Sequence, residues 1–131
     1  MSFAVKAIDH VEVFVSDIAA AAKWYEEVLG LKEMARWDPE PVMIGPERVG
    51  ASVAKLALFR RDSARAASAG PLKISEGWRR VAWLVDKAGF EAAKKHLESR
   101  GIRFHEQDHG MSRSVYFSDP DGNPLEITYY V

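Results

Sequence analysis

A small set of side chains in this 131-residue sequence has the chemistry to bind a ligand or to move a proton. His10 and Glu12 are two residues apart, so a strand would place both on one face. His109, Tyr116 and Glu126 follow towards the C-terminus. Imidazole and carboxylate groups bind divalent metals, and imidazole and phenol groups exchange protons, so metal chemistry and acid–base chemistry are both open.

The composition excludes several other chemistries. The chain has no cysteine, which removes disulfides, thiolate metal sites and cysteine nucleophiles. Its 18 basic and 19 acidic residues give a formal charge of −1, with no basic excess for nucleic acid. No apolar run approaches the ~20 residues of a membrane span, and the N-terminus lacks a signal-peptide pattern. We therefore expect a cytoplasmic protein whose partner is a small molecule, not nucleic acid or a membrane.

The first 30 residues predict a strand followed by a helix. Residues 8–15 alternate in type, with three valines on one face. The opposite face of this predicted strand carries His10, Glu12 and Phe14. Residues 18–29 are rich in Ala, Glu and Leu and stop at Gly30, a common residue at the C-terminal end of a helix. A histidine and a carboxylate are thus expected side by side on a strand.

The same order of elements returns in the second half of the chain. Residues 79–85 predict a strand and 88–99 a helix, and later strands are expected near 102–106, 114–118 and 125–130. An offset of 70 residues carries His10 onto Arg80, and an offset of 69 carries Ala57 onto Glu126. Two nearly equal offsets indicate an internal repeat. Residues 61–76 lack periodicity and are interpreted as a linker or mobile loop.

The segment from His109 to Glu126 carries the most specific motif. It contains, in order, a histidine, Tyr116, the turn sequence Asp119-Pro120-Asp121-Gly122 and a glutamate. This order resembles the C-terminal motif of extradiol ring-cleavage dioxygenases. Together with the opening Ile8-Asp9-His10-Val11 and the repeat, it identifies the chain as a member of the vicinal oxygen chelate superfamily. That superfamily includes glyoxalases, bleomycin-resistance proteins and the extradiol dioxygenases.

The resemblance implies a fold and a cofactor. The fold is α+β, with two tandem βαβββ modules that form curved mixed sheets around a cup. The modules would span residues 7–60 and 77–131 of a single domain, 1–131. On the concave side, residues of the first and last strands would hold a divalent ion such as Fe²⁺, Mn²⁺, Ni²⁺ or Zn²⁺. A homodimer is also expected, because the superfamily commonly builds its cups between modules of two chains.

Four strand positions carry the metal ligands of the superfamily, and here they hold His10, Ala57, Arg80 and Glu126. His10 and Glu126 are suitable ligands, whereas Arg80 stands where the dioxygenase branch has its second histidine. A guanidinium stays protonated and has no lone pair, so it cannot replace an imidazole. Glu12 is an alternative third ligand. Without a metal, Arg80 and Glu126 would instead form a charge-assisted pair.

Two hypotheses follow. The first is a dioxygenase- or lyase-like enzyme with an altered metal site, in which His10 and Glu126 hold the ion while His109 and Tyr116 handle protons. The second is a metal-free protein of the bleomycin-resistance type that binds or sequesters a small anionic or aromatic ligand. Residues expected to contact the ligand are Glu12, Phe14, Phe59, Arg80 and Tyr130. Retention of His10, His109, Tyr116 and Glu126 favours the enzyme. His105 is interpreted as a surface residue.

Overall fold

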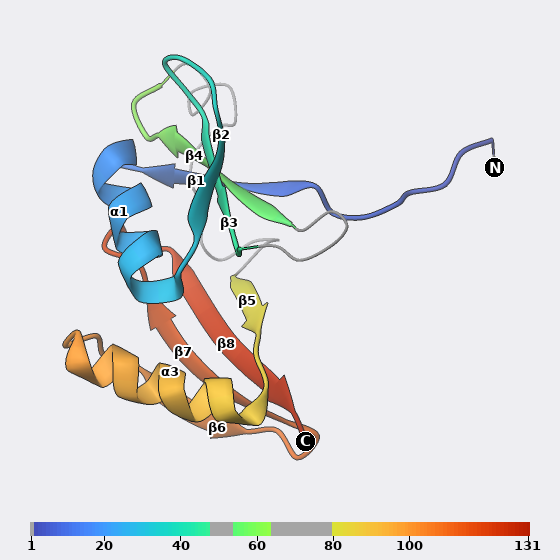
Figure 1. The fold of residues 1–131 in the computed structure, drawn as a ribbon, viewed down its shortest axis with the longest axis vertical. Helices are drawn as coiled ribbons and strands as arrows, with labels where there is room; N and C mark the ends of the chain where they lie inside the picture. The colour runs from blue at the N-terminus through green and yellow to red at the C-terminus, as the bar shows by residue number, and fades with distance from the viewer. Residues whose placement is uncertain (1, 48–53, 64–79) are drawn as a thin grey trace. The chain divides into compact units, whose positions relative to one another are not determined.

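The computed structural model describes residues 2–47, 54–63 and 80–131. The chain divides into two compact units, Met1–Pro71 and Leu72–Val131. In its described part, each unit consists of a four-stranded sheet and one helix (Figure 1). The predicted linker, residues 61–76, lies outside the described residues from position 64 onward.

The first unit has one mixed sheet. Its elements are β1 (His10–Val15), α1 (Ile18–Leu29), β2 (Lys32–Arg36), β3 (Val42–Gly45) and β4 (Lys55–Arg60). The strand order is β1-β4-β3-β2, in which β1 and β4 run parallel and the other neighbours antiparallel. The strand predicted at residues 8–15 therefore starts two residues later than expected, at His10.

Helix α1 begins and ends where the sequence predicts. The Asp17 side chain accepts a hydrogen bond of 2.9 Å from the backbone N–H of Ala20, which satisfies one of the unpaired groups at the helix start. Gly30 ends the helix with φ +70°, a conformation that a side chain would strain. The residues that α1 buries are spaced along one face: Ala21, Tyr25 and Val28.

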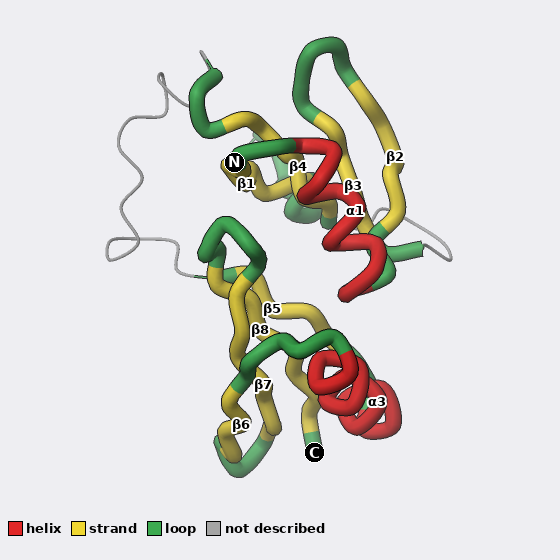
Figure 2. Tube along the Cα trace, turned by 90° about the vertical axis from the view of Figure 1, so that its left-hand side faces the viewer, coloured by secondary structure: helices red, strands yellow, loops and turns green. Residues whose placement is uncertain are grey.

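The second unit repeats this topology. Its elements are β5 (Val81–Leu84), α3 (Lys87–Ser99), β6 (His105–Asp108), β7 (Ser112–Ser118) and β8 (Pro124–Tyr130). The strand order is β5-β8-β7-β6, with β5 parallel to β8 (Figure 2). The predicted α+β fold of two tandem βαβββ modules is confirmed. The strand expected at 102–106 instead begins at His105.

Helix α3 packs on one face of the second sheet. Asp86 caps it by accepting a hydrogen bond of 2.7 Å from the N–H of Gly89. Phe90 is buried and its ring lies 4.9 Å from that of Tyr129 on β8. Because side chains alternate along a strand, Glu126 and Thr128 lie on the opposite face from Tyr129. No helix in the described part of the chain is long and apolar enough to cross a membrane.

The strand register confirms the internal repeat. Glu12 pairs with Ala57 across β1 and β4, and Ala82 pairs with Glu126 across β5 and β8. The offsets of 70 and 69 residues carry the first pair onto the second. The paired residues of β1 and β4 therefore have counterparts in β5 and β8.

Candidate functional site

The second sheet has a polar face on the side away from α3. Tyr116 on β7 pairs with His105 on β6 and with Glu126 on β8. Paired residues in neighbouring strands project to the same side, so these three side chains share one face. Ser114 and Thr128 are also paired and lie on this side. We call these five residues, His105, Ser114, Tyr116, Glu126 and Thr128, the polar face.

Tyr116 is the centre of the polar face. Its hydroxyl oxygen lies 2.7 Å from Nε2 of His109. Its ring stacks on that of His105, with centroids 5.0 Å apart and an angle of 26° between the planes. The guanidinium carbon of Arg80 lies 4.5 Å from the centroid of the Tyr116 ring, within cation–π range. A half-buried phenol thus contacts three basic side chains.

His109 and Tyr116 form a pair suited to proton transfer. At 2.7 Å, Nε2 of His109 accepts a hydrogen bond from the phenol when this nitrogen is unprotonated and donates one when it is protonated. The sequence singled out both residues for this role. The structure brings them together, and their part in catalysis stays a prediction.

Arg80 and Glu126 do not form the ion pair suggested by the sequence. Within the described residues, Arg80 instead contacts the Tyr116 ring. The reason lies in the strand boundary. The ladder between β5 and β8 begins at Val81 and Leu125, so Arg80 precedes the first paired residue. Its side chain then lies along the sheet towards β7, while Glu126 stays in the ladder beside Ala82.

The floor of the polar face is internally satisfied. The Ser114 side chain is buried, and its hydroxyl donates a hydrogen bond of 3.0 Å to Oγ1 of Thr128. The Thr128 hydroxyl in turn donates 3.1 Å to the backbone carbonyl of Arg113. Because buried polar groups without partners are costly, this chain of bonds keeps a polar floor stable. The polar groups of this face that could contact a ligand are therefore those around Tyr116.

The corresponding face of the first sheet carries an apolar cluster beside His10 and Glu12. Phe14, Ala57 and Phe59 form a buried cluster against which Met43 packs. The rings of Phe14 and Phe59 are 5.8 Å apart, and each residue is only 9% exposed. The two phenylalanines expected to line a ligand site therefore pack against each other. Of the other expected contact residues, Tyr130 lies at the end of β8 and is 69% exposed.

Comparing the repeats position by position shows where the polar residues are concentrated. Tyr116 and Met43 occupy equivalent positions, because they pair with Glu126 and Ala57 respectively. His105, in turn, corresponds to Ala35. Three polar residues of the second unit thus have apolar counterparts in the first. One position goes the other way, since Glu12 of the first unit corresponds to Ala82, whereas His10 corresponds to another basic residue, Arg80.

His10 is held by a neighbour that sequence reasoning missed. Its Nδ1 lies 2.8 Å from a carboxylate oxygen of Asp9, whose other oxygen accepts 3.0 Å from Nζ of Lys55. The hydrogen bonds to His10 and Lys55 hold the pKa of the Asp9 carboxyl below its usual value. Adjacent strand residues point to opposite faces, so alternation argued against this contact. Asp9 lies before the first residue of β1, so the alternation of side chains along a strand does not apply to it.

His105 was also missed, because it was interpreted as a surface residue. It is exposed, yet its ring covers Tyr116. A usable signal was present in Gly110, which allows a two-residue turn between β6 and β7. A turn of that length fixes the register that places His105 opposite Tyr116.

The donor set does not fit a divalent metal site with three or four protein ligands. Of the four expected ligand positions, Ala57 has no donor atom and Arg80 has no lone pair. Across the residues that the structure describes, no three His, Asp or Glu side chains lie close enough to hold an ion. His10 and Glu12 share one face of the first unit, and Glu126 belongs to the second.

The fold is that of an α+β protein of two βαβββ units, and the polar face belongs to the second of them. The sequence profile of the Glyoxalase/Bleomycin resistance protein/Dioxygenase superfamily matches residues 7–127. The chain belongs to this superfamily.

Relatives within it carry different activities. Glutathione transferase FosA of Serratia marcescens is 27% identical over 122 residues, covering 93% of this chain and 79% of the relative. Lactoylglutathione lyase of Agrobacterium tumefaciens superposes with a TM-score of 0.71 at 27% identity, covering 95% and 94% of the two chains. The antibiotic-binding protein TnmS3 of Streptomyces sp. CB03234 has a TM-score of 0.71 at 22% identity and bears on the fold alone, covering 98% and 99%. The superfamily is thus established, and its extradiol dioxygenase branch is not singled out.

Proposed function

We propose that the protein binds a small organic molecule with one acidic group on the polar face of the second unit, without a three-ligand metal site. The observation that carries this proposal is the placement of Arg80 over the ring of Tyr116, at a position where the superfamily resemblance implies a metal ligand. A guanidinium there repels a cation and attracts an anion. The geometry thereby favours the second of the two hypotheses drawn from the sequence.

The neighbours of Arg80 narrow the class of ligand. Its planar fork of donors suits a carboxylate or a similar oxyanion. His105 is exposed, and the face of its ring turned away from Tyr116 offers a flat surface to an aromatic or otherwise planar body. Glu126 is half-buried on the same face, so it disfavours a second acidic group and accepts a hydrogen bond from a hydroxyl or amine. The favoured ligand is a planar mono-acid with a hydrogen-bond donor.

The names of two relatives, a glutathione transferase and a lactoylglutathione lyase, support a small-molecule ligand. We therefore propose a probe set of benzoate, salicylate, catechol and reduced glutathione, with uncharged benzamide as the comparison for charge. Binding would be followed by calorimetry and by the rise in unfolding temperature.

Arg80→Ala is the decisive variant for this proposal. We expect benzoate or salicylate to bind the wild type and to bind this variant about tenfold more weakly, because a charge-assisted hydrogen bond is lost. Arg36→Ala is the matched control, since Arg36 is an exposed arginine of the first unit that pairs with Glu33. Equal affinity in the wild type and Arg80→Ala, or equal binding of benzoate and benzamide, would refute the proposal.

A second function is favoured by the contact between Asp9 and His10. A carboxylate on one imidazole nitrogen leaves the other, Nε2, oriented to bind an ion, as is common for metal-binding histidines. In a metal-assisted dioxygenase- or lyase-like enzyme, a divalent ion would act as a Lewis acid. His10 and Glu126 would be its two protein ligands.

Calorimetric titration of the metal-stripped protein with Fe²⁺, Mn²⁺, Ni²⁺ and Zn²⁺ distinguishes the two functions. Micromolar binding that is lost in His10→Ala would support the enzyme and justify testing His109 and Tyr116 as its catalytic residues. Absence of binding that depends on His10 would leave the metal-free function.

A further inference from the structure

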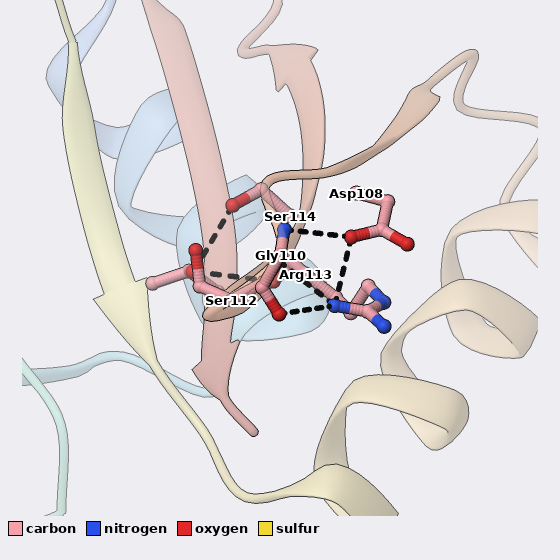
Figure 3. Close-up of polar contacts among 6 residues, drawn as sticks. Asp108, Gly110, Ser112, Arg113 and Ser114 are labelled. Atoms are coloured by element: carbon pink, nitrogen blue, oxygen red, sulfur yellow. Dashed lines mark hydrogen bonds and ion pairs between the residues drawn. The ribbon is translucent and has the colours of Figure 1, made fainter.

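The turn that carries His109 is held by hydrogen bonds and an ion pair of its own (Figure 3). The backbone N–H of His109 donates 2.9 Å to the carbonyl of Ser112, so Gly110 and Met111 form a two-residue loop between β6 and β7. Gly110 has φ +82°. Met111, which follows it, does not have a positive φ, because every described residue with a positive φ is a glycine. Positive φ at the first loop position alone is the arrangement of a type II′ turn.

Two charged side chains hold this turn from the strands on either side. The Asp108 carboxylate accepts 2.7 Å from the N–H of Gly110 and lies 2.9 Å from Nη1 of Arg113. The same guanidinium nitrogen donates 3.1 Å to the carbonyl of Gly110 and 3.3 Å to that of Ser112. Figure 3 shows the carboxylate and the guanidinium converging on the loop backbone. We call Asp108 and Arg113 the turn clamp.

A third contact fixes the other side of the loop. The backbone N–H of Val131, which follows β8, donates 2.9 Å to the carbonyl of Met111. Backbone groups of His109, Gly110, Met111 and Ser112 are therefore all engaged. A loop whose polar backbone is paired on both sides has little freedom to open.

The turn clamp sets the position of His109 relative to Tyr116. His105, which stacks on the Tyr116 ring, lies four residues before His109 and on the same side of β6. The phenol side chain thus reaches along the sheet from one histidine to the other. A shift of the turn by about 1 Å would break a hydrogen bond of 2.7 Å.

We infer that Asp108 and Arg113 are positioning residues that fix His109 for its hydrogen bond to Tyr116. Ion pairs at the surface contribute little to stability, so the fold does not depend on this one. Its structural effect is local, because each of the two side chains also bonds to the loop backbone. The consequence for ligand binding rests on the proposed function, whereas the effect on His109 belongs to the free protein.

Imidazole NMR of the free protein tests the inference directly. In protein labelled with ¹⁵N-histidine, the ring nitrogens of the four histidines report their protonation and hydrogen bonding separately. Arg113→Met should move the His109 ring signals to values of a solvent-exposed imidazole, whereas those of His96 on α3 should stay in place. Arg113→Lys, which keeps the charge and three donors, should restore much of the wild-type spectrum.

The matched control is Glu106→Gln. Glu106 lies on the same strand and the same side as Asp108, and it pairs with Lys94 on α3, away from the turn. This variant should lose a similar few degrees in unfolding temperature and leave His109 unchanged. If Arg113→Met folds poorly, a comparison of Asp108→Ala with Asp108→Asn makes the same test. Only the asparagine keeps an oxygen that accepts the hydrogen bond from Gly110, so Asp108→Ala should change the His109 signals more.

Unchanged His109 signals in Arg113→Met, or an equal change in Glu106→Gln, would overturn the inference. Benzoate titration then separates it from the proposed function. If both hold, Arg113→Met binds benzoate about fivefold to tenfold more weakly than Glu106→Gln does. If Arg113→Met changes the His109 spectrum but the wild type binds none of the probes, the proposed ligand is refuted and the role of the turn clamp is supported.

Discussion

Arg80 illustrates how a single side chain changes the ligand that a shared fold attracts. A histidine at this strand position would offer a lone pair to a cation, whereas a guanidinium offers only donors and a fixed positive charge. Its guanidinium stays close to the sheet because it lies over the Tyr116 ring. The charge of Arg80 therefore repels a cation and attracts an anion, which is the basis of the proposed function.

Arg80→His should raise the affinity for Zn²⁺ and Ni²⁺ by at least about tenfold, because it removes a repelling charge and adds an imidazole ligand. Calorimetry on the metal-stripped variant measures this change. Arg80→Ala removes the charge without adding a ligand, so its gain should be smaller. Unchanged affinity in a folded Arg80→His protein would show that Arg80 is misassigned to a ligand position.

Tyr116→Phe separates the hydroxyl of Tyr116 from its ring. The ring contacts with His105 and Arg80 should persist, while the bond to His109 is lost. We expect a loss of about 0.5–1.5 kcal/mol in the free energy of unfolding, the usual net value of a hydrogen bond. Urea denaturation measures it, with Tyr130→Phe as the control at an exposed tyrosine. A larger loss, or equal losses in both variants, would contradict this account.

At the scale of elements, local signals were predictable and cross-strand contacts were not. Asp17 and Gly30 mark the ends of α1 because capping depends on residues close in sequence. The stacking of His105 on Tyr116 depends on register, which the sequence indicates only through the turn at Gly110. The contact between Asp9 and His10 depends on where β1 starts, and strand ends are poorly marked in sequence.

Lys94 joins two elements of the second unit and gives a pH-dependent prediction. Its Nζ lies 3.1 Å from Glu91 on α3 and 3.3 Å from Glu106 on β6, and the hydrogen bonds and charges of these carboxylates raise its pKa above 10.5. A raised pKa in the folded state means stabilisation that is complete below pH 10.5 and is lost as the pH rises through the folded-state value.

Lys94→Met should therefore lower the free energy of unfolding at pH 7 by up to about 1 kcal/mol. The difference from the wild type should shrink at pH 11 and above, where the wild-type lysine loses its charge. Urea denaturation of both proteins at the two pH values measures the effect. A difference that is the same at both pH values would show that packing of the lysine stem, and not its charge, is responsible.

At the scale of the whole molecule, the two units share one topology but differ in the residues that occupy the same face of their sheets. The first unit places Phe14, Ala57 and Phe59 on its sheet face, whereas the second has Glu126 and Thr128 at the positions of Ala57 and Phe59. Apolar filling stabilises a sheet, whereas half-buried polar groups cost stability and provide recognition. The sequence offset alone located these positions, since Ala57 and Glu126 are aligned by it. Their burial and partners required the structure.

Both units also place an apolar residue on a strand at the edge of the described sheet. Val11 on β1 is 36% exposed, and Leu84 on β5 is 72% exposed. Exposed edge strands with apolar side chains tend to pair with another chain. We propose that a second copy of this chain covers them, in agreement with the homodimer that the superfamily resemblance implies.

Analytical ultracentrifugation at micromolar concentration should then give the mass of a dimer. Leu84→Lys should shift the equilibrium towards monomer by at least about tenfold, because a charge on an edge strand opposes pairing. Met34→Lys is the comparison, since Met34 is also an exposed apolar residue but lies on β2, at the other edge of the first sheet. A wild-type protein that sediments as a monomer would refute the proposed dimer. Equal effects of the two substitutions would place the interface away from β5.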